Sequence, residues 1–293
     1  ITDTCRYVKP EAIHIAECWP PEQAIVDATS QGGAGFDALQ NDGLREALRS
    51  AISQAATGRE SRVNMDGIAA ELRASQLSDG WRAVQCVENH DLVYKGRDKR
   101  ISRLADGSNP HSWYASTRSR VALGIIATAV GIPHIFMGQE ILEDKPWHDE
   151  PNSPYQVWWS GIEQIPAMAD HLQFSRDLLA ARASLPGLRG EGINVFHVHN
   201  DNRVIAFHRW VEGIGQDVVV VCSFNEETQW HYQLGMPQAR RWQERINSDA
   251  YHNGLNPYCH GNGGQITANA QPCHGLPASC RIVIPANSIL ILS

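Results

Sequence analysis

The chain has 293 residues, which is room for one large domain or two of ordinary size. Hydrophobic residues make up 42% of the chain, and its formal net charge of -7 argues against nucleic acid or an anionic membrane as the main partner. The longest apolar run, Val121 to Ile132, is shorter than the ~18 residues of a membrane-spanning helix and contains glycines, so it predicts a buried helix.

The seven cysteines show no regular spacing. Four of them lie in or beside apolar segments and are predicted to be small buried hydrophobes, namely Cys5, Cys18, Cys86 and Cys222. No CxxC pair supports a metal site at Cys259-His260 and Cys273-His274, so we predict a reduced, cytoplasmic protein without metal or cofactor. Because the chain begins with Ile1 rather than Met, we expect it to be part of a longer protein.

The first elements alternate between strand and helix. Residues 3–9 are predicted to end a helix, and 12–16 to form a short strand that runs into Glu17. Trp19 and the two prolines after it would form a rigid surface of sugar size, although Glu17 could instead be an ordinary solvated residue at a strand end. A very short strand is expected over 36–39, and helices over 43–56 and 66–75.

A third strand over 83–88 runs straight into a polar rim, Glu88-Asn89-His90-Asp91. Catalytic groups of α/β barrels lie at the C-terminal ends of strands, so a carboxylate beside an imidazole there predicts a site. The alternative is a polar turn in which Asp91 caps a helix.

The next segment is predicted as a basic solvated loop over 94–109 and a long helix over 112–130, capped by Ser112. A strand over 134–137 would lead to Glu140, which we interpret as structural. A helix is expected over 166–184. The loop between them holds tryptophans that we assign to packing, with a sugar platform as the alternative, namely Trp147, Trp158 and Trp159.

Four strand–helix units predict parallel strands joined by right-handed crossovers. We therefore predict half of an α/β barrel over 1–187 and an antiparallel β-sandwich over 188–293, the latter from short strands divided by turn residues. These strands are expected over 194–199, 203–210, 217–224, 230–234, 241–246, 278–284 and 288–292, with 250–277 as loop.

Three segments together resemble a known family. They are Ile15-Ala16-Glu17, Val87 to Asp91, and Gly131-Ile132-Pro133 leading to Gly138-Gln139-Glu140. In this order, ahead of a β domain containing Ile246 to Asp249 and Gly275 to Ser279, they resemble the α-amylase superfamily and, within it, the C-terminal half of bacterial α-1,4-glucan branching enzymes.

The resemblance implies strands 5–8 of a (β/α)8 barrel, an α-glucan substrate and a retaining mechanism. It implies that Glu17 is the acid/base and that Asp91 stabilises the transition state. His90, Asn89 and Trp19 would bind the sugar.

The family's nucleophilic Asp belongs to a Gly-x-Arg-x-Asp pattern ahead of the glutamate, and this chain has none. The segment Arg62 to Asp66 has the wrong spacing and follows Glu17. We expect that the chain begins after that strand, that the other half of the barrel is missing or supplied by another polypeptide, and that the chain alone is inactive. The alternatives are an α-glucan hydrolase of amylase or trehalose-related type, and a non-catalytic module with the amylase fold.

Overall fold

A computed structural model describes residues 1–151 and 154–293 of the chain. Its first sheet consists of four short parallel strands in the order β1-β2-β3-β4, as the strand–helix alternation predicts. Because the strands are parallel and adjacent, their C-terminal ends lie along one edge of the sheet. The strands are β1 (Ile15–Ala16), β2 (Ala38–Asn41), β3 (Ala83–Gln85) and β4 (Ile132–Pro133).

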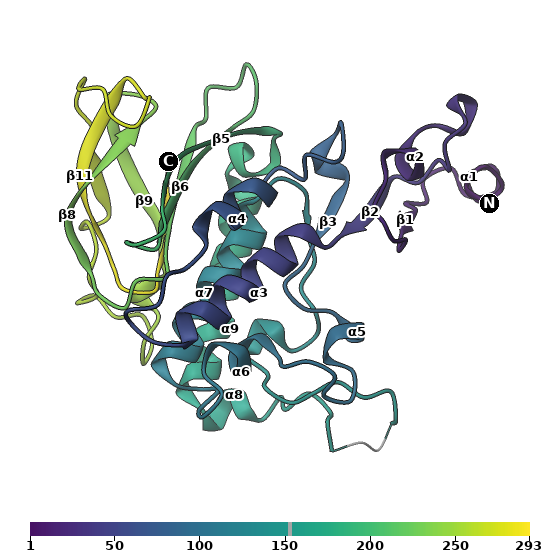
Figure 1. Ribbon diagram of the computed structural model, residues 1–293, viewed down its shortest axis with the longest axis horizontal. Helices are drawn as coiled ribbons and strands as arrows, with labels where there is room; N and C mark the ends of the chain where they lie inside the picture. The colour runs from purple at the N-terminus through teal and green to yellow at the C-terminus, as the bar shows by residue number, and fades with distance from the viewer. Residues whose placement is uncertain (152–153) are drawn as a thin grey trace.

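Helices connect and follow these strands, and the longer ones lie between the parallel strands and the C-terminal sheets (Figure 1). The predicted helix over 43–56 is confirmed in full as α3, and Ser112 caps α7 by accepting a hydrogen bond from the Ala115 amide at 3.1 Å. The α-helices are α1 (Thr2–Val8), α2 (Gln23–Val26), α3 (Gly43–Ala56), α4 (Met65–Glu71), α5 (His90–Val93), α6 (Ile101–Ala105), α7 (Trp113–Thr128), α8 (Gly161–Gln164) and α9 (Pro166–Ser184). Short 3-10 turns cover Thr29–Gln31, Gly80–Arg82, Gln139–Ile141, Pro186–Arg189 and Ser248–Ala250. No helix in the described ranges has the length and apolar character needed to cross a bilayer.

The C-terminal part is antiparallel, as predicted. A six-stranded sheet has the order β10-β9-β12-β7-β6-β5, and a pair β11-β8 lies against it (Figure 1). The strands are β5 (Gly192–His199), β6 (Val204–Trp210), β7 (Val218–Ser223), β8 (Gln229–Met236), β9 (Arg241–Asn247), β10 (Gln265–Thr267), β11 (Ala278–Ile284) and β12 (Ile289–Leu292).

The six-stranded sheet buries both of its faces. One face packs on the helices, so that a single apolar core runs from Leu48 of α3 through Ile125 of α7 to Phe207 and Val220 of the sheet. The other face packs on β8 and β11 around the buried Trp242. Alternate residues of a strand point to opposite faces, which is how β6 and β7 contribute to both cores.

Arginines bind backbone carbonyls where the helices meet the sheet. Arg203, before β6, donates to the carbonyls of Gly58 at 2.8 Å and Ser61 at 2.6 Å in the loop after α3. Arg209 of β6 donates to the carbonyl of Thr128 at the end of α7. The Thr128 carbonyl is one of those that a helix end leaves without a partner, and Arg209 satisfies it.

Three predicted elements differ from the structure. The strand predicted over 134–137 lies at Ile132–Pro133, where it pairs with β3, and the chain turns away after the His134 amide donates to the Gln85 carbonyl at 2.7 Å. The predicted loop over 94–109 contains α6, whose first amide is held by a side chain from another segment. The predicted loop over 250–277 contains β10, because Ile266 is buried against the sandwich core.

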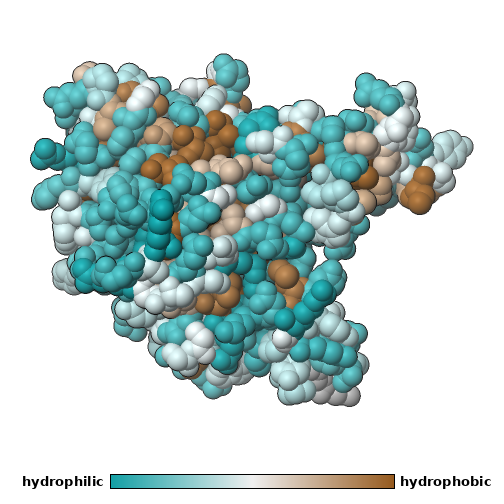
Figure 2. Space-filling model, in the orientation of Figure 1, coloured by the Kyte–Doolittle hydropathy of each residue, from teal (hydrophilic) through white to brown (hydrophobic). Residues whose placement is uncertain are grey.

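The N-terminal segment with α1, β1 and α2 projects from the rest of the molecule at the end opposite the sandwich (Figure 1). Hydrophobic residues reach the surface on this projection in Figure 2, and Ile1, Val8 and Ile13 are all more than three-quarters exposed. The prediction that Cys5 and Cys18 are buried is wrong for this reason: Cys5 is exposed and Cys18 half-buried, whereas Cys86 and Cys222 are buried.

Candidate active site

Three of the predicted site residues meet at the C-terminal edge of the parallel sheet. Glu17 follows β1, while His90 and Asp91 form the first turn of α5 after β3. One carboxylate oxygen of Glu17, one of Asp91 and one ring nitrogen of His90 all lie within 4.8 Å of one another. Residues more than seventy positions apart therefore converge because β1 and β3 both pair with β2 in parallel.

The three groups are exposed and open to solvent. His90 Nε2 lies 3.4 Å from Asp91 Oδ1, so the imidazole and the carboxylate form a contact pair beside Glu17. Two carboxylates and an imidazole at this spacing can contact neighbouring atoms of one sugar ring, or coordinate a cation. Within the described residues, Cys259 and Cys273 join no such cluster of three ligands.

A pocket of about 480 Å³, within the range typical of small-molecule sites, adjoins this cluster: Asp91 lines it, whereas Glu17 and His90 are not among its lining residues. The predicted residues Trp19, Asn89 and Asp91 all line it. The remaining lining residues are polar, charged or aliphatic, namely Asp42, Arg45, Leu92, Arg97 and Asp98. The pocket thus contains an aromatic surface, carboxylates and guanidinium groups, which is a surface suited to a polyhydroxylated ligand.

The side chain of Asn89 binds the backbone of α5. Its side-chain oxygen accepts a hydrogen bond from the Leu92 amide at 3.0 Å and so caps α5, and the residue is only 3% exposed. Asn89 therefore fixes the turn that presents His90 and Asp91.

Glu88 anchors the same turn from the buried side, a role that our sequence analysis missed. Its carboxylate lies 3.0 Å from Arg100 Nε, and both side chains are almost fully buried. It also accepts the Ile101 amide at 2.8 Å, which begins α6. The signal in the sequence was a glutamate at the end of an apolar strand, because a carboxylate buried there needs a positively charged or hydrogen-bonding partner.

Arg45 and Asp42 are two further site residues that sequence reasoning did not select. Arg45 forms an ion pair with Asp42 and lies 5.9 Å from the centre of the Trp19 ring, so it holds that tryptophan at the pocket wall. Burial raises the pKa of Asp42, Arg45 counters that shift, and the negative charges of Glu46 and Glu17 raise it further. Asp42 follows β2 as Glu17 follows β1, and that parallel was the available signal.

The structural role of Glu140 stays a prediction, and of the tryptophans assigned to packing Trp159 is 59% exposed. Glu140 lies in a 3-10 turn, outside the residues that line this pocket. Trp147 contacts the site, because its ring lies edge-on at 6.0 Å from that of His90 and 6.3 Å from that of Phe136. Trp158 and Trp159 are absent from the pocket lining.

His134, directly after β4, lies near the same cluster. Burial lowers the pKa of His134, the charge of His90 lowers it further, and Glu17 raises it. Asp66, by contrast, lies at the start of α4 and binds the side chain of Asn200 at 2.5 Å. Because α4 packs against β5 and β6, the Arg62–Asp66 segment belongs to the sandwich side of the molecule and not to this site.

Comparisons with known proteins agree with this fold. Residues 196–293 match the family model described as "Alpha amylase, C-terminal all-beta domain". The whole chain is 27% identical to 39% of the 1,4-alpha-glucan branching enzyme GlgB 1 of Xanthomonas campestris pv. campestris (strain 8004). It is 26% identical to 38% of the 1,4-alpha-glucan branching enzyme GlgB of Pseudomonas syringae pv. syringae (strain B728a). The chain thus spans about two fifths of the length of these relatives.

Solved structures of the superfamily share the fold. The alpha-amylase of Geobacillus thermoleovorans, complexed with acarbose, matches 98% of this chain and 54% of its own at a TM-score of 0.66 and 16% identity. The catalytic module of the pneumococcal glycogen-degrading virulence factor SpuA matches 99% of this chain and 48% of its own, at a TM-score of 0.68 and 14% identity. The resemblance predicted from the three motifs is confirmed: this chain has the fold of the α-amylase superfamily, with its C-terminal all-β domain, and is similar in sequence to branching enzymes.

Proposed function

We propose that the chain carries the acid/base half of a retaining α-glucan-acting site and serves in 1,4-α-glucan branching. The observation that carries this proposal is the convergence of Glu17, His90 and Asp91 within 4.8 Å of one another, next to a pocket that Asp91 and Trp19 line. In this proposal β1 to β4 are strands 5–8 of a (β/α)8 barrel spanning 1–187, and 188–293 form the sandwich domain. The parallel strand order and the family match over 196–293 support it.

Each residue has a distinct role in the proposed chemistry. Glu17 protonates the leaving glycosidic oxygen and then takes the proton of the incoming sugar hydroxyl, as retention requires. Asp91 places negative charge beside the oxocarbenium-like ring, and His90 and the Asn89 amide bind hydroxyls of that ring. Trp19 offers a flat face for a glucose unit.

A retaining mechanism also needs a nucleophilic carboxylate, about 5–5.5 Å from the acid/base. The sequence contains no Gly-x-Arg-x-Asp pattern, so we propose that the nucleophile comes from outside these 293 residues. The purified chain is then expected to bind α-glucan without turning it over. A cytoplasmic location, and the absence of nucleic-acid and membrane partners, remain predictions.

Binding of maltoheptaose to the full chain tests the site. Titration calorimetry should show binding by the wild type, a loss of about tenfold or more in affinity for Asp91→Asn, and retained binding for Glu17→Gln. Asp201→Asn is the matched control, because Asp201 is exposed and lies outside the pocket. Equal affinity of Asp91→Asn and Asp201→Asn would contradict the proposed site.

Turnover distinguishes the candidate functions. After incubation with amylose, new α-1,6 branches or new reducing ends from the chain alone would contradict the proposed external nucleophile. Once a polypeptide carrying the nucleophile restores activity, new branches without reducing ends support branching, and reducing ends assign a hydrolase. In that active complex, Glu17→Gln should lower the rate by about 10²–10⁴-fold while sugar binding persists. Maltoheptaose binding that never converts to turnover would assign a non-catalytic glucan-binding module.

A further inference from the structure

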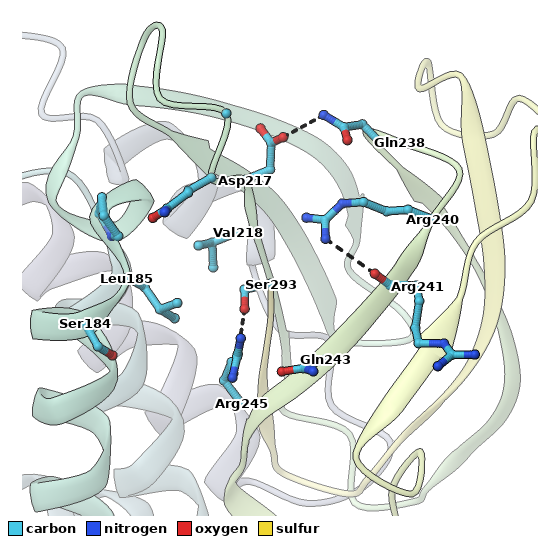
Figure 3. A pocket seen from close by; sticks show the side chains of 13 residues that line it. Ser184, Leu185, Asp217, Val218, Gln238, Arg240, Arg241, Gln243, Arg245 and Ser293 are labelled. Carbon is cyan, nitrogen blue, oxygen red and sulfur yellow. Dashed lines mark hydrogen bonds between the residues drawn. The ribbon is translucent and has the colours of Figure 1, made fainter.

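A second, larger pocket lies on the other side of the molecule's helical layer, where the end of α9 meets the sandwich. Its volume is about 640 Å³, and it shares no lining residue with the pocket that Asp91 and Trp19 line. Leu185 and the segment around it form one wall, and β7, β9 and Ser293 form the other (Figure 3). Three arginines and one aspartate line it, an excess of two positive charges in a chain whose net charge is -7.

Two of these arginines are held in place by contacts that leave most of their donors free. The guanidinium of Arg240 stacks on the buried Trp242 at 3.7 Å from the ring centre and points into the pocket (Figure 3). Arg245 donates from Nε to the hydroxyl of Ser293 at 2.7 Å, so its two terminal nitrogens keep their hydrogen-bonding capacity. Among the described residues neither arginine has a carboxylate partner within salt-bridge distance.

The aspartate of the pocket is already engaged. One carboxylate oxygen of Asp217 contacts His208 Nε2 at 2.6 Å, and the other accepts from the Gln238 amide at 2.8 Å. In Figure 3 the Asp217 carboxylate lies beside Gln238 and on the same side of the pocket as Arg240, away from Arg245. With three arginines against one aspartate, the pocket lining still has an excess of positive charge.

We propose that this pocket binds a phosphate monoester of small-molecule size, with Arg240 and Arg245 as its anion ligands. Guanidinium groups with preset orientation bind oxyanions through charge-assisted hydrogen bonds and lose little entropy in doing so. The two groups approach from different positions on the wall, which suits a tetrahedral phosphate with oxygens in several directions better than a planar carboxylate. The volume beyond them accommodates the organic part of the ligand, such as a sugar.

The test uses titration calorimetry of the full chain with inorganic phosphate, glucose 6-phosphate and neutral maltoheptaose. Glucose 6-phosphate should bind more tightly than inorganic phosphate, and Arg245→Gln should weaken it by about tenfold or more. Arg281→Gln is the matched control, because Arg281 is an exposed arginine of β11 outside the pocket and the variant removes the same charge. Arg240→Gln provides a second variant, with circular dichroism checking that its fold is intact.

The outcomes separate the possible sources of the ligand. Tighter binding of a phosphorylated maltooligosaccharide than of glucose 6-phosphate would assign the phosphate to a glucan chain, and the reverse to a free metabolite. No binding of either phosphate at millimolar concentration, or equal weakening by Arg245→Gln and Arg281→Gln, would overturn the proposal. Because the two pockets are separate, Arg245→Gln should leave maltoheptaose affinity at the Glu17–Asp91 site unchanged, so failure of one proposal is distinct from failure of the other.

Discussion

Removing the charge of Glu88 should destabilise the protein strongly, although Glu88 is no catalytic group in our scheme. Its side chain is fully buried and that of Arg100 is 2% exposed, so the 3.0 Å ion pair between them is shielded from solvent. In Glu88→Gln the new amide oxygen can still accept the Ile101 hydrogen bond, but the Arg100 charge stays buried without a counter-charge. Breaking a buried pair in this way typically costs about 3–5 kcal/mol of unfolding free energy.

Urea unfolding followed by circular dichroism measures this loss. Glu46→Gln is the control, since Glu46 pairs with Arg45 at 3.4 Å on the surface and should change stability by less than about 1 kcal/mol. In Glu88→Gln/Arg100→Met the unpaired charge is gone, so the double variant should be more stable than Glu88→Gln alone. A loss below about 1 kcal/mol for Glu88→Gln, or no recovery in the double variant, would refute the view that this pair holds the His90–Asp91 turn.

Two further predictions concern the helical layer. Ser112→Ala removes the α7 cap and should lower the unfolding free energy by about 1 kcal/mol in the same assay, whereas the exposed Ser53→Ala on α3 should not lower it. His171 is fully buried, and burial together with the nearby Arg120 charge lowers its pKa to about 3. Because the unfolded chain takes up this proton near pH 6.5 and the folded chain does not, stability should fall as the pH drops from about 6.5 toward 3. His171→Leu should reduce that slope by up to about 1.4 kcal/mol per pH unit, and the exposed His252→Gln should not; identical slopes would contradict the assignment.

Sequence periodicity succeeded where an element's stability is local. The helix is predicted from five apolar side chains at helical spacing, of which four are buried and Ala47 is half-buried; the four are Leu44, Leu48, Ala51 and Ile52. It failed where a distant group completes the element: α6 begins on an oxygen of Glu88, and β10 forms because Ile266 finds the sandwich core. Neither partner is visible within the segment itself.

The residues of the candidate site also divide into those that the sequence predicted and those that it did not. The positions of Glu17 and of His90-Asp91 followed from the rule that polar residues after parallel strands share one edge. Arg45 could not be found in this way, because it comes from the first turn of α3 and reaches the pocket through its contacts with Asp42 and Trp19. The Arg240–Arg245 pocket was equally hidden, since it forms between segments that approach only in the folded molecule.

The arginines that cross from the sandwich to the helices have a mechanical consequence. Arg203 binds carbonyls of the loop after α3, and Arg209 binds the carbonyl at the end of α7. The apolar core is shared by the helices and the six-stranded sheet. The helices and the C-terminal sheets, which a topology diagram shows as separate layers, are thereby joined into one cooperative unit. Neither can loosen without exposing the other, so heating should produce one calorimetric transition for the whole assembly of helices and strands.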